Sequence, residues 1–313
     1  MEDFMKKLSL ISFLVFGPSV LFSMKPSDLL IKAVAQNNVF NARKLLDQGV
    51  NANTVEGTEE LRFPVLIMAI HRKNIDMVRL LLDHGADVNA LEIVGTLYTP
   101  ALSEAIVTKN PDINIIKLLL DHGANVDLPD KNGNTPLMFA VMWGHNEIAV
   151  LLIDNGADVN AKDKLGYTAL IFAVQKNNLP LVKLLIKNGV EVNNRTRLRD
   201  TALKCALENG NFGIIRLLLN AMSKRINESP NPEELIKFVD ADIKKALKGI
   251  VLKKSRSIEL LKVFHMFARR HPEEFPGLEK EINQLMNQAL VKRAAGRKEE
   301  TFKETMHYQR TLR

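Results

Sequence analysis

The chain has 313 residues, of which 46% are hydrophobic and only 6% aromatic, and its formal net charge at pH 7 is +7. This length allows two ordinary domains, or one repeat array with an additional region, and the low aromatic content suits a core of Leu, Ile, Val and Ala. The single cysteine, Cys205, excludes an intramolecular disulfide framework and a cysteine-rich zinc site. We expect Cys205 to be a small buried core residue.

The first 23 residues are predicted to form a signal peptide. Lys6 and Lys7 precede the apolar run Leu8–Phe22, and the small residue Ser23 follows it at a plausible cleavage point. The run is short for a membrane span, which needs about 20 residues. We therefore expect a cleaved signal and a secreted or periplasmic protein. An uncleaved membrane anchor and a buried helix are the alternatives.

The stretch Asn134–Gly166 has the pattern of two short antiparallel helices followed by a hairpin-like loop. Thr135-Pro136 supplies a capping hydroxyl and a ring that suits the first turn of a helix. Apolar residues then follow at helical spacing, and Gly144 and Gly156 end the two helices. One such unit cannot bury its own apolar face, so the pattern predicts similar neighbours.

Two positions of this unit recur along the chain. Alanines recur in the first helix and glycines close the second helix, at Ala33, Ala69, Ala105, Ala140, Ala173 and Ala206 and at Gly49, Gly85, Gly123, Gly156 and Gly189. Their spacing clusters near the ankyrin period of about 33 residues. Residues 27–222 therefore resemble six ankyrin repeats. The resemblance implies an all-α solenoid of stacked helix-turn-helix units with hairpin loops, followed by a C-terminal helical cap or domain.

The sequence departs from the ankyrin pattern at one structural position. The histidine that usually follows Thr-Pro-Leu is replaced in the repeats by Ile67, Ser103, Met138, Ile171 and Lys204. The hydrogen bonds of that histidine must be missing or replaced. We expect weaker specificity between repeats without a change of fold.

The resemblance also implies where a partner protein would bind, namely on the hairpin tips and the concave first-helix face. Carried over position by position, the candidate contacts are His71, Arg72, Lys131, Asn132, Asn134, Met142, Trp143, Lys164, Leu165, Tyr167, Gln175 and Lys176, with Glu208 and Asn209 in the sixth repeat. Trp143 is the only tryptophan and occupies a position that the family leaves variable, and tryptophan is enriched among interface anchors. Packing against a neighbouring repeat is the alternative role for Trp143.

Two connections between repeats are longer than the others. Val55–Arg62 and Leu91–Thr99 each belong to a connection that is three residues longer than the later ones. Insertions in repeat proteins fall in loops and often on the binding side. These two stretches are candidate contact loops, with neutral variation in loop length as the alternative.

A change of pattern follows Met222, where the closing glycine of the sixth repeat is missing. Residues 223–295 predict three helices, with Pro230 and Pro232 in the preceding linker and the second helix over Ser257–Arg270. We expect these helices to cover the open end of the array, or to form a separate binding domain. Residues 296–313 are predicted to be a poorly ordered basic tail.

No catalytic, cofactor-binding or metal-binding motif is recognisable. His84 and His122 occupy the same position of two repeats, a repeat apart, and no carboxylate or cysteine completes a ligand set for them. The positive charge lies beyond residue 222 and is interleaved with acids, so nucleic acid is not a favoured partner. The sequence predicts a monomeric, non-enzymatic module that binds a protein, with no small-molecule substrate and no membrane contact except through an uncleaved N-terminal segment. A scaffold that positions a functional C-terminal domain is the alternative.

Overall fold

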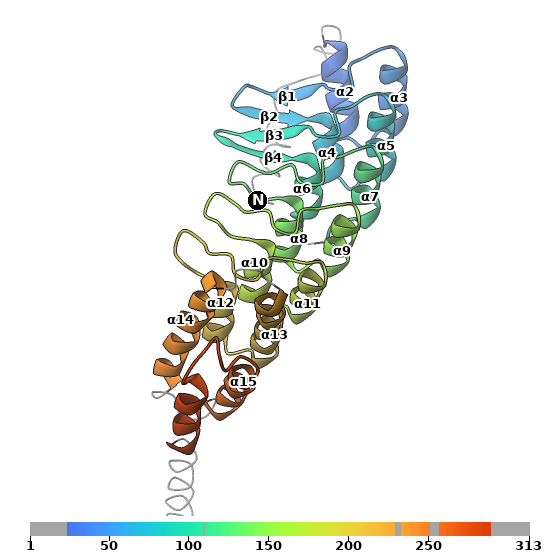
Figure 1. Cartoon of the computed structure of the whole chain (residues 1–313). Helices are drawn as coiled ribbons and strands as arrows, with labels where there is room; N and C mark the ends of the chain where they lie inside the picture. The colour runs from blue at the N-terminus through green and yellow to red at the C-terminus, as the bar shows by residue number, and fades with distance from the viewer. Residues whose placement is uncertain (1–23, 109, 229–232, 251–256, 289–313) are drawn as a thin grey trace, which may run out of the picture. The chain divides into compact units, whose positions relative to one another are not determined.

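A computed structural model of the protein describes residues 24–288, except residues 109, 229–232 and 251–256 (Figure 1). The predicted signal peptide and basic tail lie outside the described residues. The chain divides into two compact units, Met1–Phe139 and Ala140–Arg313. Among the described helices, none is both long and apolar enough to cross a lipid bilayer.

The first unit consists of helix pairs with strands between them. In chain order its elements are α2 (Pro26–Ala35), α3 (Val39–Asp47), β1 (Val55–Gly57), β2 (Leu61–Pro64), α4 (Val65–His71), α5 (Ile75–Asp83), β3 (Leu91–Val94), β4 (Leu97–Pro100), α6 (Ala101–Ile106) and α7 (Ile113–Asp121). The unit boundary then falls inside α8 (Pro136–Trp143).

The second unit continues the helix pairs and ends in longer helices. Its elements after α8 are α9 (Asn146–Asp154), α10 (Ala169–Gln175), α11 (Leu179–Lys187), α12 (Ala202–Asn209), α13 (Phe212–Glu228), α14 (Glu233–Ile250) and α15 (Ser257–Arg270). A further helix covers residues 278–288. The predicted array boundary at Met222 falls inside α13, which continues to Glu228.

Short polar side chains set the helix starts. Asn38, Asn74 and Asn178 each accept a hydrogen bond from the backbone amide three residues later, so they cap the second helices of their pairs. Thr168 and Thr201 cap first helices in the same way. The helices bury Leu, Ile, Val and Ala against one another, and the helical solenoid predicted from the sequence is confirmed.

The two long connections form β-hairpins that pair into one antiparallel sheet in the order β1-β2-β3-β4 (Figure 1). Leu61 lies opposite Val94 and Arg62 opposite Ile93, which joins the first hairpin to the second. The amide of Gly95 also donates to the carbonyl of Glu60 at 2.6 Å. The extra residues thus add a small sheet to the all-α fold expected from the sequence, because each connection is long enough to fold back on itself.

Asparagines in the connections hold successive repeats together. Asn53 Oδ1 accepts the amide of Asp87 at 2.6 Å, and Asn89 Oδ1 accepts that of Asn125 at 2.8 Å. In the second unit, Asn160 Oδ1 accepts the amide of Glu191 at 2.6 Å. Each bond satisfies a backbone donor of the following repeat with a side chain of the preceding one.

Apolar packing replaces the missing family histidine. Ile67, Ser103, Met138 and Ile171 are all buried at this position. Lys204, in the last repeat, pairs instead with Asp200. The position thus contributes to the apolar core in three of these five repeats, and hydrophobic burial there stabilises the stack without the hydrogen bonds of histidine.

The C-terminal helices pack against the last repeat. Val239, Ile243 and Leu247 on α14 are buried, as expected for one helical face. His271, just after α15, is almost fully buried and hydrogen-bonds to Ser223 of α13. These contacts place α14 and α15 as a helical cover on α12 and α13.

Candidate functional site

Two neighbouring loops of the second unit form an exposed surface, which we call the tip patch, residues 162–166 and 195–199. The amide of Arg197 donates to the carbonyl of Leu165 at 2.8 Å, so the two loops touch. Gly166 permits this approach, because a Cβ there would lie 3.1 Å from the carbonyl oxygen of Arg195. Leu165 is 52% exposed and Leu198 is 70% exposed.

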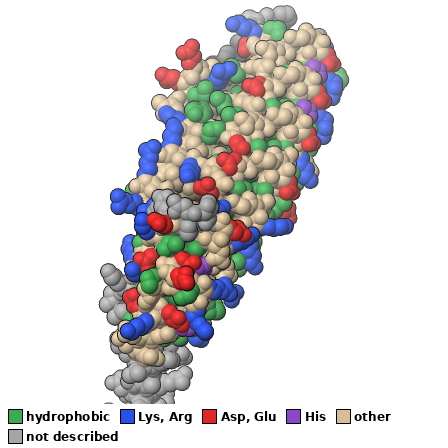
Figure 2. All heavy atoms as spheres, in the orientation of Figure 1, with side chains coloured by type: hydrophobic (Ala, Val, Ile, Leu, Met, Phe, Trp, Pro, Cys, Tyr) green, Lys and Arg blue, Asp and Glu red, His purple; other side chains and the backbone are tan. Residues whose placement is uncertain are grey.

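The tip patch carries positive charge around these leucines. Its exposed basic side chains are Lys162, Lys164, Arg195, Arg197 and Arg199. Asp163 is the one acid within the patch, and Asp200 directly follows it. Asp163 Oδ1 accepts the amides of Leu165 and Tyr167, and Asp200 pairs with Lys204. Figure 2 shows Lys and Arg side chains along the left edge of the view, the side on which Figure 1 draws the loops between helix pairs.

Tyr167, a predicted contact, also takes part in the packing of its loop. Its ring stacks on Phe172, with the ring centroids 5.3 Å apart, and it is half-buried. The stacking fixes the end of the loop that carries Lys164 and Leu165. These two predicted contacts therefore project from a rigid base.

A second group of predicted contacts lies at the ends of the first helices. Trp143 is the last residue of α8 and is 51% exposed, whereas Met142 is half-buried. Gln175 and Lys176 are exposed at the end of α10. Asn209 donates its side-chain amide to the carbonyl of Val174 at 2.8 Å, which links α12 to α10.

The predicted loop contacts of the first unit divide into surface and structural residues. Asp130 is buried, and its carboxylate accepts the amides of Asn132 and Asn134 and the side-chain amide of Asn134. Asn134 therefore shapes the loop, whereas Asn132 remains exposed. Lys131 is half-buried and its amide donates to the carbonyl of Tyr98 at 3.2 Å.

The hairpin sheet of the first unit exposes apolar side chains. Leu61 is 41% exposed and Val94, its cross-strand partner, is 40% exposed. Leu97 and Tyr98 on β4 are also exposed, at 53% and 36%. We call these four residues the sheet patch.

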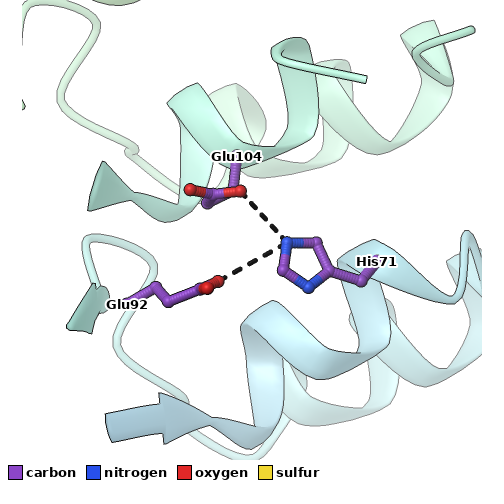
Figure 3. A group of neighbouring side chains, drawn as sticks. All are labelled: His71, Glu92 and Glu104. Carbon is purple, nitrogen blue, oxygen red and sulfur yellow. Dashed lines mark hydrogen bonds and ion pairs between the residues drawn. The ribbon is translucent and has the colours of Figure 1, made fainter. Parts of the chain in front are cut away.

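His71, another predicted contact, meets two carboxylates instead of pointing freely outward (Figure 3). Its Nε2 atom lies 3.1 Å from Glu104 Oε2 and 3.5 Å from Glu92 Oε2. The neighbouring Arg72 is exposed. The three side chains of this cluster are between 14% and 23% exposed, so the cluster is shielded but reachable from solvent.

Burial and the neighbouring charges shift the pKa values of Glu92 and His71 in this cluster. The pKa of the Glu92 carboxyl is raised to about 7, by burial first and then by the charge of Glu104, while His71 opposes the rise. Burial alone would lower the pKa of His71, but its hydrogen bond with Glu104 and the two carboxylate charges outweigh burial and raise it.

The sequence analysis did not predict part of the tip patch or the two carboxylates beside His71. The tip-patch residues Arg195, Arg197, Leu198 and Arg199 were not predicted, although the alternating arginines in NNRTRLRD were a visible signal. Glu92 and Glu104 were not connected with His71 because no spacing rule relates a strand residue to two helices. Only the folded stack brings them together.

Comparison with known families places most of these residues in matched regions. A family model described as ankyrin repeats, in three copies, matches residues 98–163 and 159–229. A model described as a single ankyrin repeat matches residues 63–92. Together the matches cover just over half of the chain. No curated protein matches the chain.

Proposed function

The chain belongs to the ankyrin-repeat family, whose members are general protein-interaction modules and typically not enzymes, and on this premise we propose that it binds a partner protein through its tip patch. The observation that carries the proposal is the pair of exposed leucines, Leu165 and Leu198, on touching loops. Exposed apolar side chains with a polar rim are typical of interaction sites.

Charge indicates the chemistry of the partner. The tip patch surrounds its leucines with five exposed basic side chains and contains one acid, Asp163. An acidic surface with an apolar centre would complement this arrangement. Such complementarity mainly speeds association and sets specificity, so binding should weaken as salt concentration rises.

The ends of the first helices offer a second contact to the same partner. Trp143 is half-exposed, and a large rigid side chain of this kind often anchors an interface. Gln175 and Lys176 are exposed on the next repeat. A partner that spans loop tips and helix ends would bury Trp143, and its fluorescence would report binding directly.

The test is affinity capture of a partner, identified by mass spectrometry and then measured against purified variants. Leu198→Ser combined with Arg197→Glu should weaken binding by about 100-fold if this patch is the centre of the interface. The matched control combines Leu61→Ser in the sheet patch with Arg62→Glu, the next residue on β2, and should leave affinity unchanged. The reverse result would move the site to the hairpin sheet.

We also propose that the protein is exported, with a signal peptide cleaved near Ser23. Lys6-Lys7 followed by the apolar run Leu8–Phe22 supports this proposal. N-terminal sequencing of the exported fraction tests it. A chain that retains Met1 or Met5 in that fraction would contradict cleavage and favour the anchored alternative.

The scaffold hypothesis makes a different prediction. If the repeats only position the C-terminal helices, function should depend on the exposed surface of α15, where Met266 is 47% exposed. Met266→Ser should then abolish partner capture, while the tip-patch variants should not. Loss of capture only in the tip-patch variants supports binding by the repeats.

A further inference from the structure

We propose that His71, Glu92 and Glu104 form a binding site for a divalent transition-metal cation of the zinc type. The three ligand atoms come from His71 at the end of α4, Glu92 on β3 and Glu104 on α6, and all lie within 4.8 Å of one another (Figure 3). This inference concerns the first unit and does not depend on the tip patch.

Separation of the ligand atoms fits one shared cation. In a tetrahedral site with metal–ligand bonds of 2.0–2.1 Å, ligand atoms lie about 3.3 Å apart. The two distances from His71 Nε2 to Glu104 Oε2 and to Glu92 Oε2 are 3.1 Å and 3.5 Å. The ligand atoms of Glu92 and Glu104 lie within 4.8 Å of each other, so a cation between the three side chains requires movements within the range of side-chain rotation.

One carboxylate oxygen is short of partners. Glu92 Oε2 is fully buried and accepts no hydrogen bond from the described residues, although His71 lies 3.5 Å away. A buried carboxylate oxygen without a hydrogen bond is costly. A metal ion supplies the missing interaction.

The charges of the cluster also favour a divalent cation. Two carboxylates lie close together in a half-buried position with a single imidazole between them. A neutral imidazole, two carboxylates and one divalent cation sum to zero charge. The cation thus removes the repulsion between Glu92 and Glu104 that His71 alone balances only in part.

The ligand types select the class of metal. Calcium and magnesium take oxygen ligands, whereas zinc and neighbouring transition metals accept imidazole nitrogen together with carboxylate oxygen. Three protein ligands leave a fourth position for water, and the partial exposure of all three side chains keeps that position accessible.

The competing interpretation is an ion-pair cluster that only links the two repeats. Titration calorimetry of the full-length chain with zinc chloride distinguishes the two. We expect saturable binding of a single zinc ion, weakened at least about tenfold by Glu92→Gln, Glu104→Gln or His71→Ala. Cobalt(II) bound to the same site should give visible absorption bands that these variants lose.

The matched control is His84→Ala, because His84 also lies 3.1 Å from a carboxylate, that of Asp47, but the described residues offer no third ligand there. This variant should bind zinc as the unaltered chain does. Thermal unfolding without metal verifies that each variant folds, and the near-isosteric glutamines keep the test valid if His71→Ala does not. Absence of saturable zinc binding, equal binding by the Glu92→Gln/Glu104→Gln double variant, or equal affinity for calcium would overturn the proposal.

Discussion

Thr201 and Asp242 join the last repeat to the C-terminal cover: the Thr201 hydroxyl donates to Asp242 Oδ2 at 2.6 Å. The same hydroxyl oxygen accepts the amide of Lys204 at 3.0 Å and thereby caps α12. A single buried side chain thus fixes a helix start and the position of α14 above it.

Asp242→Ala should lower the free energy of unfolding by about 2 kcal/mol, because a hydrogen bond to a charged group is lost beside the buried Thr201. Urea unfolding measures the change. Asp240→Ala on the same helix is the control. Among the described residues Asp240 forms an ion pair with the exposed Lys244, so this substitution should cost less than about 0.5 kcal/mol. Equal losses of stability in the two variants would show that the contact of Asp242 with Thr201 stabilises the fold no more than an exposed ion pair does.

Gly57→Ala should open the first hairpin. Gly57 has φ +107°, and a Cβ there would lie 1.8 Å from the carbonyl oxygen of Leu61 across the turn. We expect a loss of about 2 kcal/mol or more and faster amide hydrogen exchange over residues 55–64. Gly95→Ala is the matched control in the second hairpin, because its Cβ would meet nothing within 4 Å at φ +62°. It should cost only about 1 kcal/mol.

Lys73→Gly should stabilise the first unit. Lys73 has φ +54°, in the left-handed region that costs a side-chain-bearing residue about 1 kcal/mol, whereas Gly144 and Gly210 occupy the corresponding turns of other repeats. We expect a gain of about 0.5–1 kcal/mol in thermal or urea unfolding. The neighbouring Arg72→Gly, at φ −77°, should instead destabilise the protein by up to about 1 kcal/mol. A loss of stability in both variants would contradict the conclusion that the backbone is strained at Lys73.

Cys205 should react slowly at neutral pH. Burial first, and then the carboxylates of Asp200 and Glu208, raise the pKa of its thiol from 9.0 to about 11. At pH 8 alkylation by iodoacetamide should be about 100-fold slower than in the urea-unfolded chain, because the thiolate fraction differs by about that factor.

The contribution of the Cys205 thiol to the stability of the fold should decrease as pH rises. The raised pKa means that the protonated thiol stabilises the fold below about pH 9, and that this contribution is lost as pH rises through 11. Alkylation of the folded chain should accelerate over the same interval. A native rate at pH 8 equal to the unfolded rate would mean that Cys205 is not protected.

The repeat core was predictable because its signals are local and repeated. The recurrent alanines and glycines required the same turn and the same packing in each repeat, and helix α15 has the predicted bounds Ser257–Arg270. The hairpin sheet was not predicted as a sheet. The added length of the two loops was visible, but pairing of Leu61 with Val94 depends on their proximity after the repeats stack.

The candidate sites show the same division. Lys164 and Leu165 were predicted from their loop position and are exposed. Asn134 and Tyr167 occupy equivalent positions of two repeats, but Asn134 bonds to Asp130 of its own loop and Tyr167 stacks on Phe172 of α10. Sequence position alone could not separate these roles, since the choice depends on which neighbour a side chain meets. His71 pairs with Glu104, 33 residues later, because the repeat period places them at similar positions and helices α4 and α6 stack on each other.

The pairing of β2 with β3 bears on how the protein can change over evolution. Main-chain groups form this junction between two repeats, so replacements at Leu61, Val94 or Tyr98 leave the pairing groups in place. Outward side chains there can diversify while the repeats stay locked in register. The two hairpins thus form a region where new binding preferences can arise at little risk to the fold.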